Sequence, residues 1–306
     1  MSWIIYAAIA PLVWSIYNVI DQFMVRKFFK DAAMIFILLS GCVAFFVGCG
    51  LLLFRGPEVF ISLQNVWILL ILGVFSLFIF LPYLKALEED EASIAVPFFQ
   101  TIPVFVFLMG WLILDEVPSL ISIGCAGLII CASLGLAFDT QEIKFRWKTC
   151  FYMLLSSMAL AANTIALRYF VQDIDWVAVV GWQMVGLGIA ALTATFLFKR
   201  NRRTIFNFVK NSPRSLLPIF CGLEVVEIIA RMSFVKALTL APSAGIVQTF
   251  NGLQPFFVLI FGALAYKLSP NWFAKTEFNH HLGWRIICSS IIFIGIYFLY
   301  TTMEIT

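Results

Sequence analysis

Charge is what this sequence has least of: 12% of its 306 residues are charged, and 62% are hydrophobic. The mean hydropathy is +0.99. Soluble domains carry about 25% charged residues and about 45–50% apolar ones. Half of that charge cannot cover the surface of a water-soluble globule of this size. The composition therefore disfavours a soluble enzyme, a disordered chain and a fibrous repeat, and it predicts a multi-pass membrane protein.

The sequence also lacks the motifs of common enzymes and cofactor sites. HExxH, GxSxG, GxGxxG and GxxxxGKS/T are missing, so nothing indicates a zinc protease, a serine hydrolase or direct use of ATP. The seven cysteines include no CxxC pair, and both histidines, His280 and His281, stand outside the apolar runs. We therefore predict no enzymatic activity, no metal and no cofactor. The scattered basic residues give no nucleic-acid footprint.

Long apolar runs, separated by charge, proline and glycine, fill the chain. Ten of them are long enough to cross a bilayer as helices of about 20 residues. The expected spans are 3–25, 32–54, 65–84, 92–114, 120–138, 149–171, 176–198, 216–238, 243–266 and 282–301. The runs lack the alternation of a transmembrane β-barrel. The predicted fold is therefore an all-α membrane protein of ten transmembrane helices, with no room for a soluble domain.

Lysine and arginine are concentrated in the connections after the first, third, fifth, seventh and ninth spans, which we call the odd connections. The seventh holds Lys199, Arg200, Arg202, Arg203, Lys210 and Arg214. Cytoplasmic loops carry the excess of basic residues in multi-pass proteins. The distribution predicts that the odd connections are cytoplasmic and that both termini lie outside. The expected location is a cell membrane, specifically a bacterial inner membrane.

The two halves of the chain share a pattern. YLKAL at residues 83–87 matches FVKAL at residues 234–238, and a proline-containing span follows each after a short break. Because each half holds five helices, an odd number, the second copy must be inverted in the bilayer. Inverted repeats that meet at the midplane are typical of alternating-access carriers. We predict repeats over residues 1–140 and 141–306; the alternative is chance similarity between apolar helices.

Together with LDE at residues 114–116, before the fifth span, these elements resemble EamA-type members of the drug/metabolite transporter superfamily. The resemblance implies ten helices, transport without ATP, and a central cavity lined mainly by helices 1, 3, 4, 6, 8 and 9. The second half departs from the pattern, since YKL at residues 266–268 stands where Leu-Asp-Glu would follow the ninth span.

The eighth predicted span carries charged residues on one helical face. Glu224, Glu227 and Arg231 are spaced i, i+3 and i+7, so Glu227 can pair with Arg231. Charges in mid-span cost about 2.5–3.5 kcal/mol each on insertion scales, so they should face a cavity or partners. Because one arginine cannot neutralise two carboxylates, we predict a substrate site in which Glu227 and Glu224 bind a proton or a cation. The alternative is a salt-bridge network between helices.

Aromatic and amide side chains on other spans complete the predicted substrate site. Trp14 and Tyr17 on the first span can stack on a cation or an aromatic metabolite, with simple packing as the alternative. Amides beside proline breaks can orient a neutral or zwitterionic solute, or they can join helices. The amides assigned to the site are Asn18, Gln100, Gln248 and Asn251.

Two charged residues near span ends are candidate gate residues. Asp21 lies near the cytoplasmic end of the first span, where it could instead neutralise Arg26. Arg168 lies near the outer end of the sixth span, where it could instead snorkel to the surface or pair with Asp173.

The function predicted from these residues is secondary active transport of a small polar metabolite, either an amino acid or an organic amine. Both signs of charge converge with amides in the predicted site, and the second carboxylate predicts proton coupling. The expected partners are the solute, the lipid bilayer and protons. One alternative is an exchanger of phosphorylated metabolites or nucleotide sugars, which would need several basic residues in the cavity. Another is a non-transporting membrane subunit or an intramembrane enzyme, which would give no solute flux.

Overall fold

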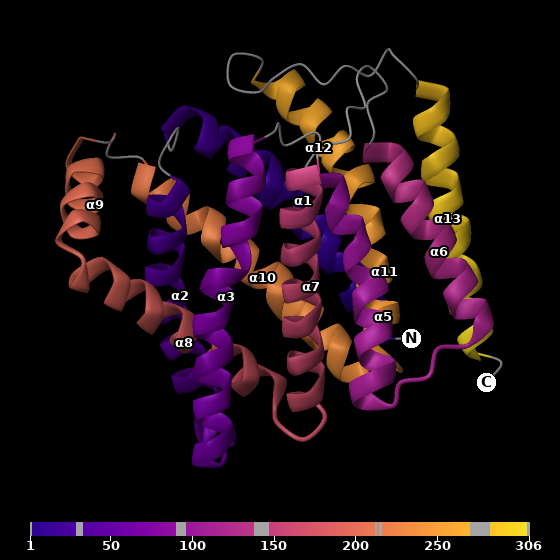
Figure 1. Ribbon diagram of the computed structural model, residues 1–306, viewed down its shortest axis with the longest axis horizontal. Coiled ribbons are helices and arrows are strands. Elements are labelled where there is room, and N and C mark those ends of the chain that lie inside the picture. The colour runs from indigo at the N-terminus through magenta and orange to yellow at the C-terminus, as the bar shows by residue number, and fades with distance from the viewer. Residues whose placement is uncertain are drawn as a thin grey trace.

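The computed structural model describes residues 2–28, 33–89, 96–137, 147–211, 213, 216–269 and 282–304. These residues form helices that pack side by side, and they contain no β-strand (Figure 1), which confirms the predicted all-α class. The elements of the first half are α1 (Ser2–Phe28), α2 (Ala33–Arg55), η1 (Gly56–Val59), α3 (Leu63–Glu89), η2 (Val96–Thr101), α5 (Ile102–Leu114) and α6 (Leu120–Ala137). Those of the second half are α7 (Trp147–Phe170), α8 (Trp176–Leu197), α9 (Lys199–Asn211), α10 (Leu216–Leu240), α11 (Ala244–Thr249), η3 (Phe250–Leu253), α12 (Gln254–Leu268) and α13 (Leu282–Glu304).

A helical segment occupies each of the ten ranges predicted as spans, and most boundaries agree within a few residues. Among the described residues, five helices are long and apolar enough to cross a membrane, and four shorter apolar helices accompany them. Length and composition thus support a multi-pass membrane protein. That ten helices cross the bilayer as two inverted repeats stays a prediction. α9 is an additional helix, in the seventh connection, where the sequence predicts only a basic loop.

The fourth and ninth predicted spans are not continuous α-helices. η2 leads into α5, and α11 and η3 lead into α12. Pro103 and Pro255 lie in the first turns of α5 and α12, where a residue without an N–H breaks no helical hydrogen bond. Irregular backbone of this kind is tolerated inside a membrane only where protein or water surrounds it. Both breaks are therefore expected to face the interior of the bundle.

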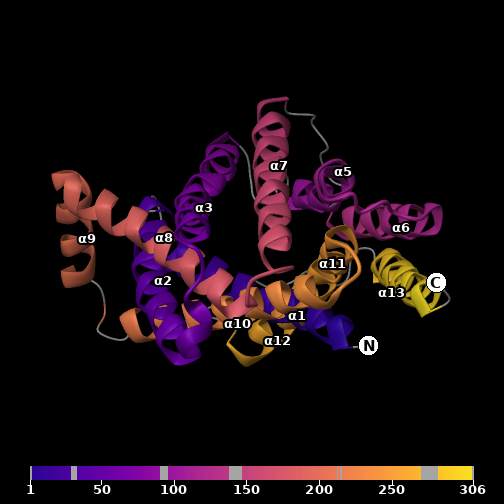
Figure 2. The same cartoon turned by 90° about the horizontal axis from the view of Figure 1, so that it is seen from below.

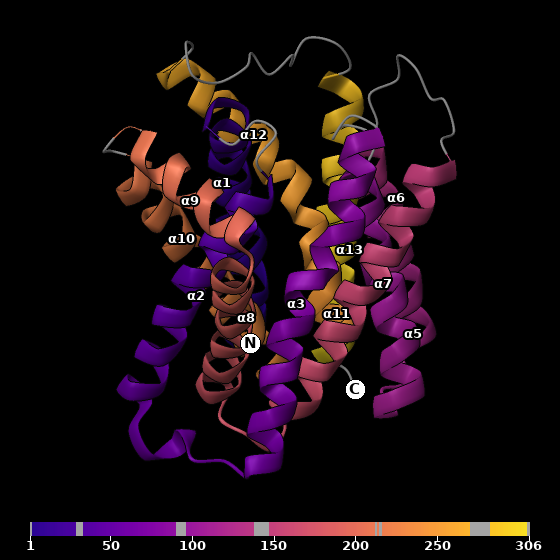
Figure 3. The same ribbon diagram turned by 60° about the vertical axis from the view of Figure 1, so that its left-hand side comes forward.

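Contacts between the two halves of the chain repeat when each helix is exchanged for its counterpart. α1 packs along α10 as α7 packs along α3, and α1 contacts α12 as α7 contacts α5. α2 lies beside α8, and α6 lies beside α13 (Figure 2). Both chain ends lie in the lower half of Figure 3, on the side where α7 passes into α8. The reciprocal contacts support a structural relation between the halves.

One contact breaks this relation. α3 packs closely along α8, whereas their counterparts α10 and α2 make far fewer backbone contacts. Two glycines permit the close approach. A Cβ atom on Gly73 would lie 2.1 Å from the carbonyl oxygen of Gln183, and one on Gly186 would lie 2.2 Å from that of Leu70. Any larger residue at either position would push the two helices apart.

Candidate functional site

Three charged side chains on α10 lie inside the bundle. Glu224 is 5% exposed, and the side chains of Glu227 and Arg231 are 18% and 21% exposed. Arg231 donates to Oε1 of Glu227 from Nε at 3.1 Å and from Nη2 at 2.8 Å. This i,i+4 ion pair is the one that the spacing permits. The charged face of α10 therefore points toward protein rather than toward acyl chains.

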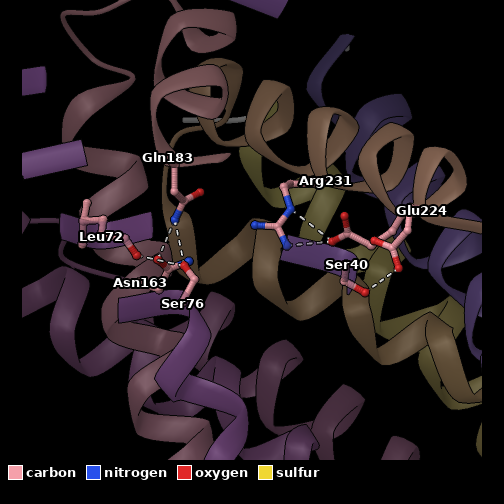
Figure 4. A network of polar contacts seen from close by, with 8 residues as sticks. Ser40, Leu72, Ser76, Asn163, Gln183, Glu224 and Arg231 are labelled. Carbon is pink, nitrogen blue, oxygen red and sulfur yellow. Dashed lines mark hydrogen bonds and ion pairs between the residues drawn. The ribbon is translucent and has the colours of Figure 1, made fainter. Parts of the chain in front are cut away.

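The second carboxylate on α10 has a partner on another helix. Ser40 of α2 donates its hydroxyl to Oε1 of Glu224 at 2.6 Å (Figure 4), a short distance that is typical of a hydrogen bond to a charged acceptor. Glu224 and Tyr17 also lie within electrostatic range of Arg231. Glu224, Glu227 and Arg231 together have a formal charge of −1. Lys236, the fourth charged residue of α10, lies over the ring of Trp176 with its Nζ 5.0 Å from the ring centre.

The predicted aromatic residues of α1 lie along the same helix. The rings of Trp14 and Phe234 are 5.5 Å apart with an interplanar angle of 50°. Tyr17 lies one turn further along α1, near Arg231, and Asn18 is half-buried beside it in sequence. The α1–α10 contact thus brings together five of the predicted site residues: Trp14, Tyr17, Glu224, Glu227 and Arg231.

A second polar cluster, absent from the predicted site, lies where α3, α7 and α8 meet. Gln183 is 1% exposed, and its Nε2 donates to Oδ1 of Asn163 at 2.8 Å and to the hydroxyl of Ser76 at 3.4 Å. No group among the described residues donates to its Oε1. α10 contacts both α7 and α8, and Figure 4 draws this cluster and the charged residues of α10 in one view. The two polar clusters thus lie on helices that contact one another.

The amides at the two broken spans are buried. Gln248 in α11 and Gln100 in η2 are 5% and 9% exposed. In the described part of the chain, neither Oε1 of Gln248 nor Oδ1 of Asn251 has a hydrogen-bond partner. Buried acceptors are normally paired with protein or with water. These oxygens are therefore available to a ligand or a water that donates hydrogen bonds.

Arg168, a predicted gate residue, forms a buried ion pair. It is 8% exposed, and its Nε donates to Oε1 of Glu116 at 2.7 Å. Its other two nitrogens donate to backbone carbonyls at the end of α10, Nη1 to Leu238 and Nη2 to Pro242. Oε2 of Glu116 accepts from the backbone N–H of Ala244 at 2.8 Å. Arg168 thus neither snorkels nor pairs with its near neighbour Asp173.

A second ion pair lies where α2 ends and α8 begins. Arg55 donates from Nε and Nη2 to the two carboxylate oxygens of Asp175, at 3.1 and 2.9 Å. Asp175 also caps α8 by accepting from the N–H groups of Val177 and Ala178. Burial alone would raise the pKa of the Asp175 carboxyl, but the hydrogen bonds and the charge of Arg55 hold this pKa below its usual value.

These two ion pairs, together with the hydrogen bond from Arg168 to the carbonyl of Pro242, link residues of all four even connections, the ones that the sequence places outside. Arg55 follows the second span, Glu116 the fourth, Asp175 the sixth and Pro242 the eighth. The even-connection end of the bundle is thus held together by charge as well as by packing. The other predicted gate residue, Asp21, belongs to α1, but its side chain lies outside the described part of the structure.

Comparison with known proteins bears on the family of the chain. Residues 1–138 match the model of the EamA-like transporter family. The resemblance to EamA-type transporters is confirmed. An uncharacterized transporter of Archaeoglobus fulgidus is 26% identical to this chain over 212 residues, which cover 69% of this chain and 71% of that protein. A crystal structure of a protein, at 16% identity, shares the fold with a TM-score of 0.70 over 97% of this chain and 96% of that one. These matches support a membrane transporter of the drug/metabolite transporter superfamily and point away from an enzyme.

Several residues of the two polar clusters are not among those predicted from the sequence. Ser40, Ser76, Asn163 and Gln183 acquire their importance from helix crossings that no local pattern reveals. Gln183 carries one available signal, because it is the amide in the middle of an otherwise apolar span, residues 176–198. Glu116 stands out in the sequence only as part of the LDE motif, and its contact with Arg168 joins residues 52 positions apart.

Proposed function

We propose that this chain is a secondary active transporter that binds a small polar metabolite at the charged face of α10. The observation that carries the proposal is the buried group of Glu224, Glu227 and Arg231 on a helix that also contacts α8, in a chain that resembles a transporter family over its first half. A membrane protein keeps charges at this depth where they have partners or a solute to bind. α1, α8 and α10 would line the site.

We further propose that the solute carries an amine, as an amino acid or an organic amine does. Glu224, Glu227 and Arg231 together have a formal charge of −1, and among the described residues three buried amide oxygens have no hydrogen-bond donor: Oε1 of Gln183, Oε1 of Gln248 and Oδ1 of Asn251. An ammonium group supplies one positive charge and three donors. Phosphorylated solutes fit less well, because Arg231 is bound to Glu227 and Arg168 to Glu116.

The proposed mechanism is alternating access by two inverted repeats, residues 1–140 and 141–306, with both termini outside a cell membrane. Glu227 and Glu224 would bind either the solute amine or a proton, because the amine and the proton would compete for the same carboxylates. The ion pairs Arg168–Glu116 and Arg55–Asp175 would close the outer side and would separate when that side opens. Reciprocal contacts between the halves support such a movement.

The test is a thermal-shift screen of amino acids and organic amines against the purified protein at two pH values. The variants are Glu227→Gln and, as a matched control, Asp173→Asn, whose exposed carboxylate lies in the turn after α7. We expect at least one amine to raise the unfolding temperature of the wild type and of Asp173→Asn, but not of Glu227→Gln. A panel that shifts none of the three proteins, or that shifts all three equally, would contradict the proposed site.

A further inference from the structure

A cationic surface outside the proposed transport site lies on α9. It consists of five exposed residues, which we call the basic face: Lys199, Arg200, Arg202, Arg203 and Lys210. Among the described residues, none of the five takes part in an ion pair, and no acidic residue stands in the first turn of the helix. Figure 1 shows α9 at one edge of the bundle. The five charges are therefore free to bind something outside the chain.

The opposite face of α9 fixes the helix to the bundle. Ile205 and Phe208 are partly buried against a cluster built from the ends of α1, α2 and α10 that adjoin odd connections, which includes Met24, Ile35 and Phe220. Asn201 also donates its side-chain amide to the backbone carbonyl of Ala194 in α8 at 3.0 Å. The orientation of the basic face is therefore set by packing rather than by chance.

A large aromatic ring stands within the basic face. Phe206 is 65% exposed. It follows Arg202 by four residues and precedes Lys210 by four, so all three share one side of the helix. A helix that presents basic residues around an exposed phenylalanine is suited to the boundary between headgroups and acyl chains.

Most of the positive charges of the basic face lie at the N-terminal end of α9, where the helix dipole disfavours them. Four of the five lie in the first five residues of α9, where the helix dipole is positive and the first N–H groups lack helical acceptors. Cations and free N–H groups together favour an anion at this position. Lys210, at the other end, is where the dipole by itself favours a positive charge.

The position of α9 along the chain sets its depth in the membrane. α8, a candidate span, ends at Leu197, and only Phe198 separates it from Lys199. One residue spans about 3.5 Å at most, so the basic face begins where the span meets the headgroups. Phe196, Leu197 and Phe198 are 63%, 71% and 56% exposed at this boundary. We propose that the basic face of α9 binds the phosphate headgroups of anionic phospholipids.

The experiment compares the protein in nanodiscs of phosphatidylcholine with and without phosphatidylglycerol. Hydrogen–deuterium exchange of the α9 amides is the readout, with exchange elsewhere in the chain as the internal reference. We expect phosphatidylglycerol to slow exchange over residues 199–211 in the wild type. Each cation near an anionic membrane contributes about fivefold in affinity, so Arg202→Gln/Arg203→Gln should lower the apparent affinity for phosphatidylglycerol about thirtyfold.

Two controls make the result specific. Both arginines are exposed, so the double variant should unfold at the same temperature as the wild type in phosphatidylcholine alone. Lys210→Gln removes one cation, at the C-terminal end of the same helix, and should lower the apparent affinity for phosphatidylglycerol about fivefold, clearly less than the double variant. Equal exchange with and without phosphatidylglycerol, an unchanged response in the double variant, or the same protection from inorganic phosphate alone would overturn the proposal. Solute transport is not part of the readout, so the outcome is independent of the proposed function.

Discussion

The contact between α3 and α8 and its counterpart between α10 and α2 are built from different chemistry. Gly73 and Gly186 bring α3 and α8 into backbone contact. This contact lies in the N-terminal halves of the two helices, toward the even-connection end of the bundle. α2 and α10 meet through the hydrogen bond from Ser40 to Glu224, which lies in the N-terminal halves of these helices, toward the odd-connection end. Phe36 and Phe220 add an edge-to-face contact at 5.3 Å.

This difference between the two contacts indicates which pair of helices can separate. Two helices in close backbone contact have one favourable packing arrangement, and their dispersion energy is lost as soon as they separate. A hydroxyl–carboxylate hydrogen bond can exchange its partner for water, for a proton or for a solute. We therefore infer that the even-connection end is closed in this structure and that the α2–α10 contact is the one that responds to ligand. Four predictions follow from this comparison, in order of decreasing effect.

Arg168→Gln should give the largest effect, because it leaves Glu116 as a buried carboxylate without its ion-pair partner at the closed end. Breaking a buried pair in this way costs about 3–5 kcal/mol. The unfolding temperature in detergent, measured by intrinsic fluorescence, should fall well below that of the wild type. Arg168→Gln/Glu116→Gln should recover part of the loss, since it removes both charges. A double variant no more stable than Arg168→Gln would show that the ion pair is not the cause.

Gly186→Ala tests the close packing of α3 on α8. Its Cβ atom would meet the backbone of Leu70, which cannot move as a side chain can, and overpacking of this kind costs about 1–3 kcal/mol. We expect a lower unfolding temperature. Gly222→Ala in α10 is the matched control, because nothing lies within 4 Å of its Cβ position; its unfolding temperature should be unchanged or slightly higher. Equal effects at the two glycines would remove the distinction between the contacts.

Ser40→Ala tests the polar contact. It deprives buried Glu224 of a hydroxyl donor, which should cost about 1–3 kcal/mol. Ser76→Ala, in the other polar cluster, should cost about 0.5–1 kcal/mol, because Gln183 keeps its 2.8 Å hydrogen bond to Asn163. The measurement is the unfolding temperature of the two variants and of Ser40→Thr, which keeps a hydroxyl and should restore the stability lost in Ser40→Ala. A larger loss for Ser76→Ala would contradict the proposed role of Ser40.

Arg55→Gln should have the smallest effect, and that effect should depend on pH. The pKa of Asp175 is lowered in the folded protein from its ordinary value of 3.8. The stability that the pair contributes is therefore present above this value and is lost as the pH falls through the lower, folded-state pKa. Unfolding temperatures of wild type and variant, measured from neutral pH downward, should converge in acid. A difference that stays constant over this range would exclude the carboxylate as its source.

The sequence predicts the helices well because most spans are long apolar runs bounded by charged residues, proline or glycine. The charged face of α10 is equally visible, since charges in an apolar span are costly wherever they point. The sequence does not predict α9, because a basic connection contains no apolar run. The two faces of α9 can be distinguished only in the folded structure, where Ile205 and Phe208 pack against a hydrophobic cluster.

Contacts between residues on different helices are not predicted from the sequence for a different reason. The sequence suggests an ion pair between Arg168 and Asp173, five positions away, but in the structure Arg168 pairs with Glu116, 52 positions away. Ser40 meets Glu224 across 184 positions. Helix crossings decide such pairs, and the angle of a crossing depends on side chains along both helices rather than on a local motif.

The measurement that tests the central claim most directly is uptake into proteoliposomes with an imposed pH gradient. The probe is the amine that gives the largest thermal shift with the wild-type protein, supplied in radiolabelled form. The account predicts accumulation by the wild type that disappears when the gradient is collapsed and that Glu227→Gln does not support. Uptake that is the same in the variant and unaffected by collapse of the gradient would contradict it.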